Sequence, residues 1–350
     1  VPFNPDVHLD VNPEGVKPND FVFLLGYPGR TFRHRSSSYI RFHKQVQLPF
    51  IENWYQWKID RLRELTEESE SQKINFAPRI KSLSNVAKNY RGKMETMKAI
   101  DLVKRRKNEE DSILAKLSRM QNKPEKELAF YEVNRSLAEN YSDIIDQGKK
   151  LFWYFQLLDN SSAMQMARQV YNLSSRLSKL PDTVTLDKAA MVKDMRSTFK
   201  KINPTLDSMF LRQLLKMGYR FKGENKVASL RQYFDKKQAI NPFIKQVYME
   251  KTGLLDTAIL FDEIRKNPRK IVDMELPLVA LWGKLAPGFQ RIDSLRRVKF
   301  SNIASLRPEY LEWKRKATEG VFVPDANSTL RLTYGRTKGY IPEDGVYYEP

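Results

Sequence analysis

The amino-acid sequence predicts a mainly α-helical protein in which a long helical block separates two shorter stretches of β-structure. Three observations support this fold class. From Leu48 to Lys316, apolar residues recur at the spacings of three and four that amphipathic helices require. The stretches on either side alternate or cluster apolar residues in the manner of strands, and proline and glycine punctuate them. The helical block has no fixed repeat period, which argues against a solenoid.

The first stretch, residues 1–45, is expected to contain β-structure. Asp20–Leu25 reads DFVFLL, a short apolar run rich in residues that favour strands. Turn-forming residues precede and follow this run, so we predict a buried strand. Because so few strands are not stable alone, we expect its partners to lie elsewhere in the protein.

The helical block, residues 46–320, is expected to begin with a helix from Leu48. The polar run Thr66–Ser71 predicts a helix end or an exposed connection. Leu151–Leu158 is apolar on nearly all sides, which predicts a helix buried at the centre of the array. Further helices are predicted at Ala163–Leu177, Leu186–Lys200, Pro204–Met217, Pro242–Glu250, Leu255–Ile264, Leu276–Leu285 and Pro308–Arg315.

Two of these helices begin with an asparagine followed by a proline, at Asn203–Pro204 and Asn241–Pro242. Asparagine is a favoured N-cap because its side-chain oxygen accepts a hydrogen bond from a free backbone N–H. Proline suits the first helical position, where its missing N–H costs nothing. Both pairs therefore predict helix starts.

The last stretch, residues 321–350, returns to a strand pattern. Ser328–Tyr334 (STLRLTY) alternates apolar and polar residues and is bounded by Pro324–Asn327 and Gly335. This period of two predicts a strand. The expected organisation is thus 1–45, 46–320 and 321–350.

The segment Ile80–Gly92 carries the main functional hypothesis. Asn85, Lys88, Asn89 and Gly92 fall on one side of the predicted helix, with Asn85 and Lys88 one turn apart. A polar face with a glycine notch is either solvated surface or the wall of a cleft. The opposite side is an apolar stripe formed by Ile80, Leu83, Ala87, Tyr90 and Met94.

Composition limits the possible functions. The formal net charge is +19, which permits an anionic partner, but acidic residues follow the densest basic run, Lys104–Lys107, at once. We therefore do not expect dedicated nucleic-acid binding. The absence of cysteine excludes disulfides and thiolate chemistry within these residues. The three histidines (His8, His34 and His43) lack metal-ligand spacing, so we expect no metal, and no apolar run is long enough to span a membrane.

No self-contained active site is evident from motifs. The sequence contains no phosphate-binding loop and no Gly-x-Ser-x-Gly elbow. Gly26–Gly29 follows a predicted strand but lacks the third glycine of a dinucleotide-binding turn. We accordingly expect no cofactor and assign no catalytic residue within the chain.

Three stretches, taken together, resemble the bacterial dipeptidyl-peptidase 7 and 11 family of chymotrypsin-like serine exopeptidases. Gly15–Phe21 (GVKPNDF) leading into Leu25–Thr31 (LGYPGRT) is similar to the late strand and turn of that family's first β-barrel. Pro324–Gly335 (PDANSTLRLTYG) is similar to the opening of its second barrel and is the most specific of the three. Ser84-Asn85, Lys88 and Gly92 resemble the family's Ser/Gln-Asn-x-x-Lys-x-x-x-Gly pattern.

This resemblance implies that the helical block is a cap domain inserted between strands of two chymotrypsin-like barrels. The parent protein would release dipeptides from the free N-terminus of peptides, and Asn85 would help to bind the substrate's α-amino group. The family's catalytic His and Asp are expected upstream of Val1 and its Ser downstream of Pro350, so the segment alone should be inactive. The resemblance also implies a homodimer in the periplasm or at the cell surface of a Gram-negative bacterium.

Two alternatives rest on the positive charge. The chain could be a non-enzymatic basic helical scaffold that binds an acidic partner or nucleic acid, which predicts steeply salt-dependent binding. Alternatively, the basic character could draw acidic peptides toward a cleft, which is compatible with the peptidase hypothesis.

Overall fold

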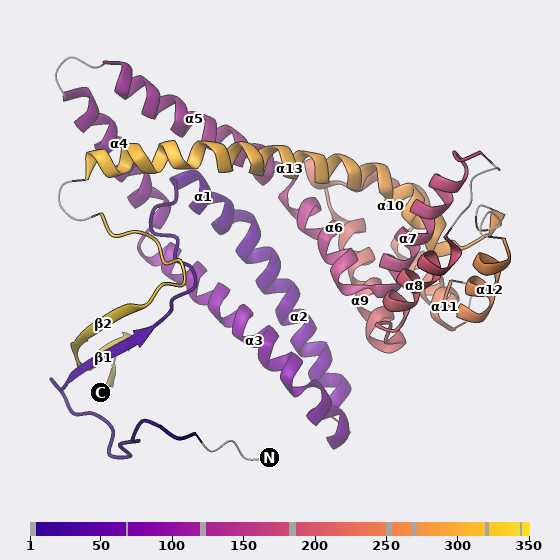
Figure 1. Cartoon of the computed structure of the whole chain (residues 1–350), viewed down its shortest axis with the longest axis horizontal. Helices are drawn as coiled ribbons and strands as arrows, with labels where there is room; N and C mark the ends of the chain where they lie inside the picture. Colours follow the sequence, from indigo (N-terminus) through magenta and orange to yellow (C-terminus); the bar gives the residue numbers. More distant parts are fainter. Residues whose placement is uncertain are drawn as a thin grey trace. The chain divides into compact units, whose positions relative to one another are not determined.

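The computed structural model describes residues 5–67, 69–119, 124–181, 187–249, 254–267, 271, 273–318, 322–343 and 345–350 (Figure 1). The chain divides into two compact units. One unit comprises Val1–Arg35 and Thr318–Pro350, and the other comprises Ser36–Ala317. The predicted helix limits at Leu186 and Glu250, and the predicted boundary at 320/321, lie outside the described residues.

The first unit is built on a pair of strands from opposite ends of the sequence. Strand β1 (Phe21–Gly26) pairs antiparallel with β2 (Arg331–Arg336), in a register that places Phe21 opposite Arg336 and Gly26 opposite Arg331. A second pair joins β3 (Tyr340–Glu343) to β4 (Val346–Tyr348). The prediction that the first strand finds its partner elsewhere in the sequence is confirmed.

The prediction that this first strand is buried is wrong for the described chain. Phe21 and Phe23 are more than 60% exposed, and Leu24 and Leu25 are also exposed. The reason is that β1 has one described neighbouring strand, and no layer of the unit covers either face of the pair. An apolar run specifies a strand that could be buried, but a covering layer is needed to bury it.

The helical unit begins earlier than predicted. Helix α1 (Ser37–Phe42) starts well before Leu48 and continues through a π-helical turn, η1 (His43–Gln47), into α2 (Leu48–Thr66). Ser36 caps α1 by accepting a hydrogen bond from the Tyr39 backbone N–H. A run of three serines has little helical pattern, which is why the sequence did not reveal this start.

A buried carboxylate fixes the start of α1. Glu110 accepts hydrogen bonds from the Ser37 backbone N–H (2.7 Å), the Ser37 hydroxyl (2.6 Å) and the Tyr310 hydroxyl (3.1 Å). Burial, followed by the nearby Glu110 charge, raises the pKa of Tyr310 above its ordinary range. One buried acidic side chain thereby links α1 to α4 (Leu102–Arg119) and to α13 (Pro277–Ala317).

The remaining helices follow the predicted block closely. Helix α2 ends at Thr66, within the polar run where a helix end was predicted, but α3 begins at Glu70, well before the predicted helical segment at Ile80. Helix α6 is buried as predicted, through Leu151, Trp153, Tyr154, Leu157 and Leu158. The helices after α2 are α3 (Glu70–Ala99), α4 (Leu102–Arg119), α5 (Pro124–Asp146), α6 (Gly148–Asn160), α7 (Ser162–Leu177), α8 (Lys188–Phe199), α9 (Pro204–Arg220), α10 (Ala228–Tyr233), α11 (Ile240–Met249), α12 (Thr257–Lys266) and α13 (Pro277–Ala317), with short 3₁₀ turns η2 (Gly223–Asn225) and η3 (Lys237–Ala239).

One of the two predicted asparagine caps is confirmed. The Asn203 side chain accepts a hydrogen bond from the Leu206 backbone N–H at 3.1 Å, and Pro204 is the first residue of α9. The other prediction is wrong, because α11 begins at Ile240 and includes Asn241. The 3₁₀ turn η3 leads directly into that helix, so its first N–H groups follow an existing turn rather than a side-chain cap.

The two helices predicted at Leu276–Leu285 and Pro308–Arg315 are a single helix. Helix α13 is 41 residues long and contains Pro287 and Pro308 in its interior. A proline removes one backbone hydrogen bond, but α13 packs along its length against α5, α6, α7 and α10, and Ile292 and Tyr310 are buried there. Tertiary packing therefore outweighs the local cost of each proline.

Candidate functional site

Asn85 lies on the exposed face of α3. Its side chain has no hydrogen-bond partner among the described residues, and Lys88 is exposed beside it. A side chain built at Gly92 would meet nothing within 4 Å, so the notch predicted on this face is open. On the other side of the helix, Leu83 and Ala87 are buried, which confirms the predicted apolar stripe.

The neighbouring helix α2 holds α3 in place. The two helices lie side by side (Figure 1). Between them, the Arg91 guanidinium donates to Oε1 of buried Glu52 from Nε at 3.0 Å and from Nη2 at 2.6 Å. A charge-assisted pair of this kind fixes both position and rotation of a helix. The Asn85 face is therefore presented from a rigid element rather than from a loop.

A cavity of about 600 Å³ lies against the adjacent side of α3, and we call it the aromatic cavity. Val86 and Tyr90 contribute to it from α3, one turn apart, while Asn85 does not line it. The full lining is Tyr39, Phe42, His43, Gln47, Ile51, Tyr55, Val86, Tyr90, Leu151, Phe152, Phe155, Gln156, Asp159, Arg296 and Phe300. This mostly aromatic surface can enclose an apolar or aromatic group.

The lining of the aromatic cavity is held in place by ring packing. Phe42 and Phe152 stack with their centroids 6.2 Å apart, and Phe50 stacks on Phe152 at 5.7 Å. The Arg296 guanidinium lies 4.9 Å from the centroid of Phe155. These contacts join α1, α2 and α13 to α6, so helices that are distant in sequence hold the lining together.

A buried lysine lies next to this cavity. Lys58 is 4% exposed, its Nζ donates to Asn160 Oδ1 at 3.0 Å, and it lies 4.1 Å from the ring centroid of Tyr55. Burial, followed by repulsion from Arg79 and opposed by attraction to Asp159, lowers the pKa of Lys58 to about 7. This environment favours the neutral form of the Lys58 amine far more than water does.

Two cavity-lining groups respond to the same environment. Burial raises the pKa of Asp159, and the Lys58 charge opposes that shift. Burial also raises the pKa of Tyr55, with smaller contributions from Tyr90 and Asp159. This group of side chains was not predicted from the sequence. Its signal was a lysine placed directly among Trp54, Tyr55 and Ile59 on an apolar helix face.

The motif stretches at the two ends of the sequence meet within the first unit. Asp325 Oδ1 accepts hydrogen bonds from the Thr31 hydroxyl and the Arg33 backbone N–H, each at 2.8 Å. The Ala326 backbone N–H donates back to Thr31 Oγ1 at 2.9 Å. The motifs LGYPGRT and PDAN are thus parts of one local structure, which explains why both occur in the same chain.

The histidines do not form a metal centre. His34 stacks on Phe322 and its Nε2 lies 2.7 Å from the Val323 carbonyl oxygen, whereas His43 packs against Tyr39 and Phe42. In the described part of the chain, no three His, Asp or Glu side chains are grouped as a metal would require. None of the described helices is long and apolar enough to cross a membrane.

Comparison with known proteins identifies the family. The sequence profile described as peptidase S46 matches residues 1–350. The chain belongs to the peptidase S46 family. The resemblance to the dipeptidyl-peptidase 7 and 11 family is thereby confirmed.

Among S46 relatives, the Asp/Glu-specific dipeptidyl-peptidase of Shewanella putrefaciens is 25% identical, over 100% of this chain and 48% of the relative. Dipeptidyl-peptidase 7 of Porphyromonas endodontalis is 23% identical, over 99% of this chain and 42% of the relative. The chain spans about half the length of these curated relatives.

A solved S46 structure shares the fold. The crystal structure of Porphyromonas endodontalis DPP11 in complex with the dipeptide Arg-Glu superposes with a TM-score of 0.73 at 20% sequence identity. The superposition covers 100% of this chain and 50% of that protein. The predicted mainly helical fold class is therefore confirmed.

Proposed function

We propose that this chain is the central part of a serine dipeptidyl-peptidase that releases dipeptides from the free N-terminus of peptides. In this proposal the helical unit, Ser36–Ala317, forms a cap domain that closes the substrate cleft. The stretches on either side of it contribute strands to two chymotrypsin-like barrels. The match of the S46 profile to the whole chain, together with relatives named as dipeptidyl-peptidases, is the observation that carries the proposal.

The exposed β1–β2 pair supports the barrel assignment. Its large apolar side chains, including Phe21, Phe23, Leu24 and Leu25, are open to solvent on a two-stranded sheet. Two strands are not stable in isolation, and apolar surface of this kind requires a covering layer. Further barrel strands supplied by the parent protein would provide that layer.

We propose that Asn85 binds the substrate's α-ammonium group. Its amide oxygen is exposed on a rigid helix and has no protein donor among the described residues, so it is available to accept from a ligand. A hydrogen bond to a charged group in a partly dried cleft contributes roughly 1.5–3 kcal/mol. An acylated N-terminus would offer one N–H and no charge, which would restrict the enzyme to free N-termini.

Asn85 can be tested in the full-length parent with a dipeptide linked to a chromogenic amine. Asn85→Ala should lower kcat/KM by about 10- to 100-fold, which corresponds to the loss of one charge-assisted hydrogen bond. Asn89→Ala is the matched control because Asn89 is exposed one turn away on the same helix. We expect less than a twofold change for this control. An Asn85→Ala enzyme with unchanged kcat/KM would show that Asn85 is an ordinary surface residue.

The catalytic groups are proposed to lie outside the 350 residues, with His and Asp upstream and Ser downstream. Reading the coding sequence on both sides tests this directly. Purified residues 1–350 should hydrolyse no peptide, because nucleophile and base are missing.

By family resemblance we also propose a homodimer exported to the periplasm or cell surface of a Gram-negative bacterium. The comparisons do not favour the alternative of a non-enzymatic scaffold, because the named relatives are peptidases.

A further inference from the structure

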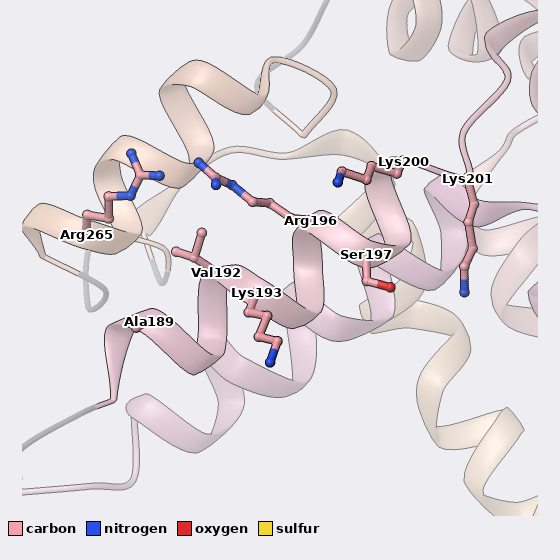
Figure 2. A pocket seen from close by; sticks show the side chains of 8 residues that line it. All are labelled: Ala189, Val192, Lys193, Arg196, Ser197, Lys200, Lys201 and Arg265. Atoms are coloured by element: carbon pink, nitrogen blue, oxygen red, sulfur yellow. The ribbon is translucent and has the colours of Figure 1, made fainter.

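A groove of about 840 Å³ lies between α8 and α12 (Figure 2), which are at the end of the helical unit far from α4 (Figure 1). We call it the basic groove. Five of its eight described lining residues are basic, and none carries a carboxylate. The lining consists of Ala189, Val192, Lys193, Arg196, Ser197, Lys200, Lys201 and Arg265. Neither the proposed amino-group site nor the aromatic cavity shares a residue with it.

Three of the cations converge. Figure 2 shows Arg196 of α8 and Arg265 of α12 extending toward each other, with Lys200 directed to the same side, while Lys193 and Lys201 point away. None of the three converging side chains forms an ion pair within the described residues. Arg196 is positioned by the ring of Phe261, whose centroid lies 5.6 Å from its guanidinium carbon.

This arrangement differs from the other charged surfaces of the unit. Several exposed arginines pair with a carboxylate three residues away on their own helix, as in Arg61–Glu64, Arg135–Glu132 and Arg315–Glu312. Attraction to the carboxyl ends of α8 and α12 explains why Arg196 and Arg265 occupy the last turns of their helices. It does not explain why two such ends face each other with no acidic residue among the described lining residues. Like charges placed together are destabilising until an anion joins them.

We infer that the basic groove binds an acidic peptide segment in extended form. The paired guanidiniums of Arg196 and Arg265 present planar donor forks that match carboxylate groups, and Lys200 adds a point charge. Val192 is buried beneath this rim and, with Ala189, supplies an apolar floor for the side chains between the carboxylates. This binding does not use Asn85 and goes beyond the proposed peptidase function.

The groove lacks what single-stranded nucleic acid would require. Such ligands bind where successive bases stack on exposed aromatic rings along a basic track. No aromatic residue is among the eight described lining residues, and the ring of Phe261, on which Arg196 lies, is buried. The basic side chains at the edge of the groove can pair with carboxylates, and the aliphatic side chains beneath them can contact apolar groups. The groove therefore suits a peptide in which acidic and apolar side chains alternate.

The test uses the 350-residue chain and a fluorescent, N-acetylated peptide of alternating glutamate and valine. Acetylation removes the α-ammonium group, so the result is independent of the Asn85 proposal. Fluorescence anisotropy should show saturable binding that weakens as salt is raised, whereas the matched glutamine–valine peptide should not bind. The double variant Arg196→Gln/Arg265→Gln should bind at least tenfold more weakly. The control Lys104→Gln/Arg105→Gln removes the same charge from exposed positions on α4 and should change binding less than threefold.

Two results would overturn the inference. The first is an equal loss of peptide affinity in the Arg196→Gln/Arg265→Gln variant and in the Lys104→Gln/Arg105→Gln control. That result would mean that the net charge of the protein alone attracts the peptide. The other is displacement of the peptide from the groove by a single-stranded oligonucleotide of equal charge at lower concentration, which would assign the groove to nucleic acid. Circular dichroism verifies that each variant is folded. Lys200→Gln provides an independent measurement, with an expected loss of about threefold.

Discussion

The helical unit places basic side chains in two opposite environments, one buried and one exposed to solvent. Lys58 is buried against Tyr55 and Asn160, and its pKa is lowered to about 7. In the basic groove, Arg196 and Arg265 are exposed and face each other, and none of the lining residues that the structure describes carries a carboxylate. Burial disfavours the charged form of the first cation. The two arginines of the groove are open to solvent, where they can contact an approaching ligand.

This difference separates basic residues that affect the stability of the fold from basic residues that act on a ligand. A buried amine changes its protonation when its surroundings demand it, so its effect should appear in the pH dependence of folding. Exposed guanidiniums affect stability little and act on what approaches from solvent. Stability should therefore respond strongly to changes around Lys58, and ligand binding should respond to changes in the basic groove.

The largest expected effect concerns Lys58→Met. The unfolded chain has the ordinary lysine pKa of 10.5, whereas the folded chain has a pKa of about 7, so folding is penalised fully below pH 7. As pH rises from about 7 toward 10.5, the folded protein loses that proton first and the penalty is relieved. Between pH 6 and pH 10, the wild type should gain about 2–4 kcal/mol of unfolding free energy relative to Lys58→Met. Urea denaturation at both pH values measures this difference.

The matched control for this experiment is Lys81→Met, because Lys81 is exposed on α3. Its unfolding free energy should follow that of the wild type at every pH. A constant difference between the wild type and Lys58→Met from pH 6 to pH 10 would show that Lys58 keeps its full charge and that the comparison with the groove fails.

A smaller effect separates the charges that act on Lys58. Arg79 lowers the pKa of Lys58, and Asp159 raises it. Arg79→Met should therefore raise that pKa, and Asp159→Asn should lower it, each by roughly 0.5–1 unit. Titration of the lysine side-chain carbons by NMR, with the Lys58 signal assigned from Lys58→Met, measures both shifts. Shifts of the same sign in both variants would contradict this assignment of charges.

The smallest expected effect is on the stability of the groove variants. Arg196→Gln and Arg265→Gln should each change the unfolding free energy by less than about 0.5 kcal/mol, since both residues are exposed and neither pairs with an acidic side chain in the described part of the chain. Any gain from reduced repulsion should disappear in high salt. Thermal denaturation at two salt concentrations measures it. A loss of more than about 2 kcal/mol would mean that these arginines hold α8 and α12 together, which would place them with Lys58 rather than opposite it.

The sequence predicted those features that depend on local spacing. The apolar stripe through Leu83 and Ala87, the buried helix around Trp153 and the cap at Asn203 were all found where predicted. Each depends on residues within two turns of one another, so the periodicity or the cap residue is sufficient to identify it. The role of Asn85 remains a prediction, because it depends on a ligand and on the rest of the parent protein.

The sequence did not predict features that depend on distant packing. The continuity of α13 through Pro287 and Pro308 depends on the helices that cover it. The burial of Lys58 depends on Asn160, about a hundred positions away, and the basic groove depends on the pairing of α8 with α12. Local patterns contain no information on such neighbours, and prolines and lysines ordinarily indicate helix ends and exposed surface.

The 41-residue helix α13 has a mechanical consequence. At 1.5 Å per residue it extends about 60 Å, and it packs against α4 and α5 near one end and against α7 and α10 near the other. The helix therefore connects both ends of the helical unit, and these ends can move relative to each other only if α13 bends. Each interior proline leaves one carbonyl group without its usual donor, which makes the turns before Pro287 and Pro308 its weakest points. Any flexing of the helical unit should be concentrated at these two positions.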